Sequence, residues 1–157
     1  RIDKEFSLGK MIESDIKNLM IDYGIPRSMT IVDSDGLGAY LESYLTGIKE
    51  FHGGSRPLSV EYDNLKSECA FKLAELINYR KIRIICTDAQ RERIKQELGV
   101  LKQDHVDADT KKKGIISKEK MKELLGHSPD YLDMLIMSMY FRIKPIPQKA
   151  KAKLATM

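Results

Sequence analysis

The pattern of apolar and polar positions predicts helices that alternate with short strands. In several segments apolar residues recur three or four positions apart, which is the spacing of a helix with one buried face. The helices expected from this spacing span residues 10–23, 36–44, 62–79, 118–125 and 129–141, and another begins near residue 89. Short runs rich in β-branched residues predict strands at 29–32, 48–51 and 82–86. This alternation is typical of an α/β domain with a central sheet.

Several of these helices have recognisable ends. Gly24 follows the first helix and suits a left-handed C-terminal residue. Either Thr87 or Asp88 can cap the helix that begins near residue 89, and Ser117 can cap the helix at 118–125, because each can accept a hydrogen bond from a free backbone N–H. The last helix has the clearest start, because Ser128 is a suitable N-cap and Pro129 favours the first helical position.

The stretch between residues 98 and 117 has a weaker pattern. We interpret 98–106 and 114–117 as two arms of a hairpin around a polar turn. Three consecutive lysines lie in this turn, and they are candidates for contact with nucleic acid: Lys111, Lys112 and Lys113.

Composition adds the domain size and the distribution of charge. A chain of 157 residues with 42% hydrophobic residues is long enough for one globular domain with a buried core. The net charge of +4 is modest, but no acidic residue follows Asp133. We therefore expect a domain at 1–144 and a basic tail at 145–157. Such a tail is either solvated or binds nucleic acid.

Cysteine usage and hydropathy favour a cytoplasmic location. Cys69 and Cys86 lie far apart within apolar patterns, so we expect buried free thiols in a reducing compartment. No apolar run approaches the roughly 18 residues of a membrane helix. No signal peptide opens the chain.

Asp33 is the first candidate for chemistry, because it follows a predicted buried strand. Ligands of open α/β sheets bind beyond the carboxyl ends of the strands. The motif DSDG also permits a structural interpretation, in which Asp33 forms a turn and Asp35 caps the next helix. The stretch by itself leaves both interpretations open.

Asp133 is the second candidate, because it lies at the flank of the apolar stripe of the last helix, one turn after Asp130. A carboxylate beside an apolar face needs either a salt-bridge partner or a bound cation. Hard cations such as Mg²⁺ take a few carboxylates together with water and phosphate oxygens. Asp133 and Asp130 are therefore candidate metal ligands, and a salt bridge is the alternative.

Other chemistries find no support in the motifs. The chain lacks GxGxxG, GxxxxGK[ST] and GxSxG, which argues against a dinucleotide fold, a P-loop and a serine hydrolase. The histidines share no metal-ligand spacing, and we interpret His52 as an ordinary loop histidine.

Four segments, in this order, resemble the C-terminal nuclease domain of phage terminase large subunits, the motors of DNA packaging. They are 31-IVDSDGLGAYLESYL-45, 48-IKEFHGG-54, 64-NLKSECAFKLAELI-77 and 128-SPDYLDMLIM-137, and the last is similar to the family's SPD-x-x-D-A-L helix. The resemblance covers residues 10–141, which is most of the chain.

The resemblance implies an RNase H-like layered fold, with a central mixed sheet flanked by helices and a nuclease centre of three acids. Asp33 matches the family's second acid and Asp133 its third. No residue matches the first acid, so we expect the chain to lack the first strands of that fold and the ATPase domain that precedes it.

The implied activity is endonucleolytic cleavage of concatemeric double-stranded DNA with two Mg²⁺ or Mn²⁺ ions. The implied partners are DNA, the portal protein and the terminase small subunit, in the cytoplasm of a bacterial host. Two alternatives remain open. One is a non-catalytic fragment that docks to DNA or to the portal, and the other is an unrelated domain that holds phosphate with Gly36 and Gly38 at a helix N-terminus.

Overall fold

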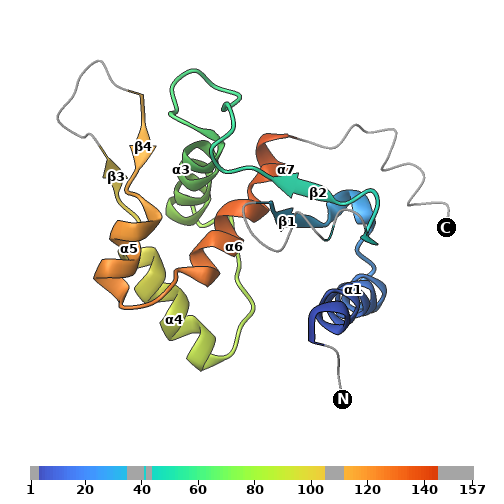
Figure 1. Ribbon diagram of the computed structural model, residues 1–157. Helices are drawn as coiled ribbons and strands as arrows, with labels where there is room; N and C mark the ends of the chain where they lie inside the picture. Colours follow the sequence, from blue (N-terminus) through green and yellow to red (C-terminus); the bar gives the residue numbers. More distant parts are fainter. Residues whose placement is uncertain (1–3, 35–40, 42–43, 105–111, 145–157) are drawn as a thin grey trace. The chain divides into compact units, whose positions relative to one another are not determined.

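The computed structural model describes residues 4–34, 41, 44–104 and 112–144 (Figure 1). Backbone contacts divide the chain into two units, Arg1–Gly53 and Gly54–Met157, and each is considered by itself. The described residues form a mixed α/β structure that is mostly helical, with two small sheets. None of the helices described has the length and apolar character needed to cross a membrane.

The first unit opens with helix α1, Lys4–Asp22. It ends as predicted at Gly24, whose φ of +60° is the left-handed conformation that glycine adopts freely. The Gly24 N–H donates to the carbonyl of Ile21, and the Ile25 N–H donates to that of Met20. These two bonds are the Schellman pattern, which satisfies the free carbonyls at a helix end.

Two predicted strands of the first unit pair with each other. After a short 3₁₀ turn η1, Arg27–Met29, strand β1 spans Ile31–Asp33 and strand β2 spans Lys49–Phe51. They are parallel, and Asp33 lies opposite Phe51. Both strands are close to the predicted positions, and parallel pairing requires the chain to cross over between them.

The core of the first unit joins α1, the sheet and the segment before β2. Its buried residues are Leu41, Leu45 and Ile48, and its partly buried ones are Ile12, Ile16 and Val32. Most of the helix predicted at 36–44 lies outside the described residues, as does the predicted cap Asp35. Leu41 and Tyr44 are described and are helical.

The second unit holds five helices and a hairpin in its described part. They are α3 Leu65–Asn78, α4 Asp88–Gly99, β3 Gln103–Asp104, β4 Gly114–Ile115, α5 Lys118–Leu125, α6 Asp130–Ser138 and α7 Tyr140–Ile143. Of the two candidate caps of α4, Thr87 is the one used, and Asp88 is the first helical residue. Ser117 caps α5 as predicted, and Asn64 caps α3. Strands β3 and β4 are antiparallel, so the predicted hairpin is confirmed, although its first arm is shorter because α4 extends to Gly99.

Helix α6 lies at the centre of this unit and packs against α3 and α4. The residues that it and the adjoining Met139 bury are Leu132, Leu135, Ile136 and Met139, all from the predicted stripe. On α3 the predicted stripe is also buried, at Leu65, Cys69 and Leu73. The charged Glu68 of α3 is buried as well, and its carboxylate accepts a hydrogen bond from the Leu58 N–H at 2.6 Å.

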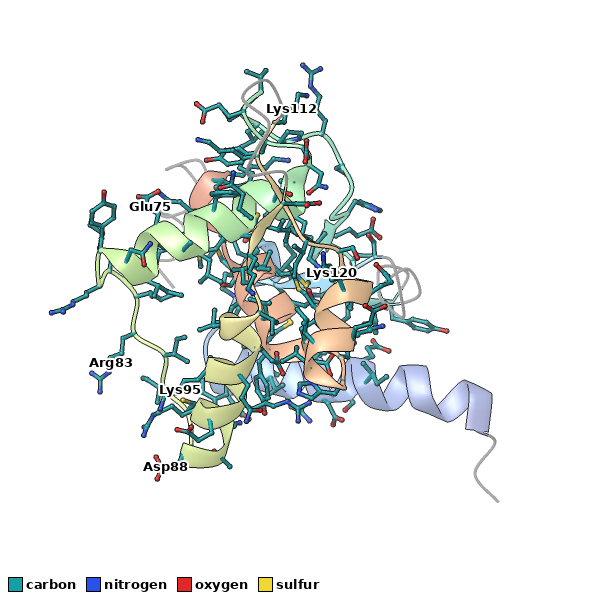
Figure 2. The ribbon with its side chains drawn as sticks, turned by 90° about the vertical axis from the view of Figure 1, so that its left-hand side faces the viewer. Glu75, Arg83, Asp88, Lys95, Lys112 and Lys120 are labelled. Atoms are coloured by element: carbon teal, nitrogen blue, oxygen red, sulfur yellow. The ribbon has the colours of Figure 1, made fainter. Side chains whose placement is uncertain are left out.

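The strand predicted at 82–86 is not assigned in the structure. Residues 81–87 connect α3 to α4 without regular secondary structure. Their burial still alternates with period two, and Ile85 is 88% exposed. The side chains thus follow a strand-like alternation, but no strand of the described part of this unit pairs with them. Figure 2 shows Arg83 pointing outward from this connection.

Candidate functional site

Asp33 is the last residue of β1, and its side chain is exposed. Since β1 and β2 are parallel, their carboxyl ends lie at the same edge of the sheet, where ligands of α/β proteins bind. Asp33 therefore places a carboxylate at this edge. The position is the one that the sequence predicted.

A chain of hydrogen bonds joins residues that follow the two strands. The Ser34 hydroxyl lies 2.7 Å from His52 Nδ1 and donates to the Phe51 carbonyl at 2.9 Å. His52 Nε2 lies 3.0 Å from the Glu50 carboxylate. His52 was predicted to be an ordinary loop residue, but it links the ends of β1 and β2 beside Asp33. The sequence did not predict this contact, because Ser34 and His52 are 18 positions apart and only the parallel pairing of the strands brings them together.

Asp133 is the centre of two ion pairs within the second unit. Its Oδ1 accepts from Lys66 Nζ at 2.7 Å, and its Oδ2 accepts from Lys118 Nζ at 2.5 Å. The pairs connect α6 to α3 and α5. Burial raises the pKa of Asp133, but the hydrogen bonds from Lys118 and Lys66 outweigh burial and leave the pKa below its usual value.

The salt bridge that the sequence offered as an alternative at Asp133 is therefore present. The carboxylate is ionised, as a metal ligand must be, but an ammonium group contacts each of its oxygens. A cation can bind there only if at least one lysine moves away.

Asp130, the other candidate on this helix, begins α6 and is exposed. Both aspartates lie in the first turn, where a negative charge interacts favourably with the helix dipole. Within the described residues, no three or more His, Cys, Asp or Glu side chains are grouped so as to hold a metal ion. Asp33 belongs to the first unit, and Asp130 and Asp133 belong to the second.

Helix α6 is capped by a side chain from another helix. Its N-cap position is Pro129 rather than the predicted Ser128, and Pro129 offers no side-chain hydrogen bond. Instead, Oε2 of the buried Glu97 on α4 accepts from the Leu132 N–H at 2.9 Å, and Oε1 accepts from Arg93 Nε at 3.0 Å. Glu97 thereby fixes the end of the helix that carries Asp133. No local pattern identifies it, because 35 residues separate it from Leu132.

The predicted lysine cluster is only partly described. Lys111 lies outside the described residues, and Lys112 is exposed (Figure 2). Lys113 pairs with Glu61, whose carboxylate accepts a hydrogen bond from Lys113 Nζ at 3.1 Å. Lys113 Nζ also lies 5.9 Å from the centre of the Tyr62 ring. Lys112 and Asp88 lie at opposite ends of the second unit (Figure 2). The basic tail at 145–157 also lies outside the described residues.

Both cysteines are free thiols, as predicted. Cys69 is buried, and burial together with the charge of Glu68 raises the pKa of its thiol to about 12. Cys86 is half-buried. Cys69 therefore does not have the lowered pKa of a reactive nucleophile.

Comparison of the chain with known protein families, curated proteins and solved structures finds no match.

Proposed function

We propose that the chain is the nuclease domain of a DNA-packaging terminase large subunit, a metal-dependent endonuclease that cuts concatemeric double-stranded DNA. The observation that carries the proposal is the position of Asp33, an exposed carboxylate at the shared carboxyl edge of two parallel strands. The ordered resemblance of four segments adds to it. In this proposal the protein acts in the host cytoplasm with the portal protein, the small subunit and an ATPase domain as partners.

By the resemblance, Asp33 and Asp133 are the residues that would hold Mg²⁺ or Mn²⁺, and Asp130 lies in the same helical turn as Asp133. When bound, such ions activate water and stabilise the leaving oxygen of the phosphodiester. The chain's own contribution is to supply carboxylates and to fix their positions. Ser34, His52 and Glu50 order the strand ends next to Asp33. The first acid of the family pattern has no assigned residue here.

The proposed fold is RNase H-like and layered, with a central mixed sheet flanked by helices. The parallel pairing of β1 and β2 supports it.

DNA contact in this proposal is mainly to phosphates. The exposed Lys112 and the lysines of the tail supply positive charge without reading bases. Binding should therefore weaken steeply as salt is raised, because phosphate contacts release counterions. Binding that does not change with salt would contradict this picture.

A non-catalytic docking module is the second candidate, and the two ion pairs of Asp133 favour it. In that case Asp133 serves only to hold α3, α5 and α6 together, and the chain binds DNA or the portal without cutting.

Calorimetric titration of the chain with Mn²⁺ tests the metal assignment. We expect weak binding that is lost in Asp33→Asn and in Asp133→Asn. Asp88→Asn is the control, because Asp88 is an exposed first-turn aspartate of α4 that pairs only with Arg91 among the ion pairs described. Wild-type binding in both test variants would overturn the metal site.

A plasmid-nicking assay with Mn²⁺ then separates the two candidates. Nicking that requires both aspartates supports the nuclease. Mn²⁺ binding without nicking, in a chain extended to include the family's first acid, favours the docking module.

A further inference from the structure

Three side chains at the carboxyl edge of β1 and β2 form a hydrogen-bonded chain with the geometry of a catalytic triad. Ser34 Oγ lies 2.7 Å from His52 Nδ1, and His52 Nε2 lies 3.0 Å from the Glu50 carboxylate. A hydroxyl within reach of an imidazole whose other nitrogen faces a carboxylate is the arrangement of an activated nucleophile. Such triads are recognised by their geometry and occur on unrelated folds. The absence of GxSxG therefore excludes one local motif but not this geometry.

The register of the sheet explains why the three side chains meet. Successive side chains of a strand point to opposite faces, and Glu50 and His52 are two positions apart. The parallel register continues past the strands, so Ser34 lies beside His52 on the same face as Glu50. The same alternation places Asp33 and the buried Phe51 on the other face. The three residues therefore form a group separate from the carboxylate of Asp33.

We propose that Ser34 is a nucleophile, His52 its general base and Glu50 the group that orients the base, in acyl transfer from small uncharged carboxylic esters. This activity goes beyond the proposed nuclease, and its chemistry involves no metal ion. When Nε2 carries the proton that faces Glu50, the neutral imidazole presents the lone pair of Nδ1 to Ser34. The Ser34 hydroxyl has a second acceptor, the Phe51 carbonyl at 2.9 Å, and its hydrogen can rotate from one to the other.

The reaction moves one proton in each step. The Ser34 Oγ forms a bond to the carbonyl carbon of the ester, and its proton passes to His52 Nδ1. The bond between that carbon and the alcohol oxygen then breaks, and the alcohol leaves with the proton from His52. Water next attacks the acyl-serine and gives a proton to His52. The bond from the acyl carbon to Ser34 Oγ breaks, Oγ takes back that proton, and the carboxylic acid is released.

The surroundings of the three residues fit this substrate class. The His52 side chain is 56% exposed and that of Glu50 is 26% exposed, so a small ester reaches the site from solvent. The carboxylate of Glu50 repels anions, which favours an uncharged ester over a negatively charged one. The buried Gly53 follows His52, and its N–H has no acceptor among the hydrogen bonds of the described residues. This N–H is a candidate donor to the oxyanion that forms on the ester carbonyl.

Fluorophosphonate labelling of the full chain, followed by peptide mass spectrometry, tests the proposal. EDTA is present throughout to exclude metal-dependent reactions. These reagents modify activated serines and spare ordinary ones, so we expect an adduct on Ser34 in wild type. His52→Asn should lower the labelling rate about 100-fold or more, because it removes the base. Glu50→Gln should lower it at least about tenfold, because an amide can hold the imidazole in the wrong tautomer.

Hydrolysis of p-nitrophenyl acetate is the second measurement. Wild type should release a burst of about one equivalent of nitrophenol as the acyl-serine accumulates, and Ser34→Ala should show no burst. Ser28→Ala is the matched control, because Ser28 is an exposed serine of the same unit without a side-chain hydrogen bond in the described part of the chain. His127→Asn is the control for His52, since His127 contacts a backbone carbonyl instead of a hydroxyl. Both controls should behave like wild type.

Two results would overturn the proposal: a wild-type chain without an adduct on Ser34, and labelling that is equally fast in His52→Asn. In either case the hydrogen bonds of Ser34, His52 and Glu50 only join the ends of the two strands. Labelling of wild type requires no variant, so it decides the question even if a variant fails to fold. Mn²⁺ binding and plasmid nicking are separate measurements, so the proposed nuclease stands or fails independently of this result.

Discussion

The cap of α6 by Glu97 provides the sharpest test of how this unit is held together. Glu97 has no exposed surface, and its carboxylate accepts from the Leu132 N–H and from Arg93. Glu97→Ala removes both acceptors and leaves a small void. The Leu132 N–H then lies at a buried helix start without the partner that it has now.

The cost of this change can be estimated from the contacts. An unsatisfied buried N–H that had a charged acceptor costs about 1–3 kcal/mol. The void adds to this, whereas Arg93 adds little because its side chain is 41% exposed and can turn to water. We expect Glu97→Ala to lower the free energy of unfolding by about 2–4 kcal/mol. In a chain of 157 residues this corresponds to a decrease in Tm of about 5–15 °C.

Urea unfolding followed by far-UV circular dichroism measures the change. Glu92→Ala is the matched control, because Glu92 lies on the same helix but is 67% exposed and pairs only with Lys95 among the ion pairs described. Its effect should stay below about 0.5 kcal/mol. Glu97→Gln keeps the volume and one acceptor, so it should fall between the two.

Amide hydrogen exchange adds a local measurement. The amide of Leu132 should lose protection in Glu97→Ala and keep it in the control. The cap would be refuted if both variants unfold at the same urea concentration and the amide stays protected.

Three further predictions follow from single contacts. Because the lysine hydrogen bonds outweigh burial and lower the pKa of Asp133, its ion pairs should stabilise the fold above the unfolded pKa and lose this contribution as pH falls through the folded value. The stability difference between wild type and Asp133→Asn in urea should therefore be constant near neutral pH and shrink below about pH 4; a difference that does not change with pH would contradict the ion pairs. Thiol labelling of the folded chain at mildly alkaline pH should modify Cys86 and leave Cys69 intact, since burial and Glu68 raise the pKa of Cys69 to about 12; equal labelling of both would contradict the burial. Asn64→Ala should destabilise the chain by about 1 kcal/mol and Asn64→Asp by much less, as measured by thermal unfolding, because only alanine removes the cap of α3.

The helices were predictable because their signals are local. The apolar spacing of α1 and α3 and the caps Thr87 and Ser117 each lie within a few residues of the structure that they determine. The strands β1 and β2 were also found, since both consist of short apolar runs next to turn residues. Their parallel pairing was not visible in the sequence, because it depends on a register between distant segments.

Burial of charged side chains was the main property that the sequence did not reveal. Glu68 and Glu97 both lie in polar stretches of their helices, yet both are buried because each accepts a backbone N–H from another segment. Conversely, Ser128 had the right chemistry for a cap but is not used. A helix start can be satisfied by any acceptor that the fold brings near, and only the fold decides which one.

The sequence by itself determined where most of the helices lie and which of their faces are apolar, and it singled out Asp33 and Asp133 as candidate acids. It left open whether Asp133 pairs with a cation of the chain or with a metal ion. The tertiary structure decided that Lys66 and Lys118 meet at Asp133, because the fold brings Lys66, 67 positions earlier in the chain, and Lys118 of the preceding helix to the same carboxylate. The physical reason is range: propensity and capping act within one turn, whereas the charge that a carboxylate experiences depends on every element packed around it.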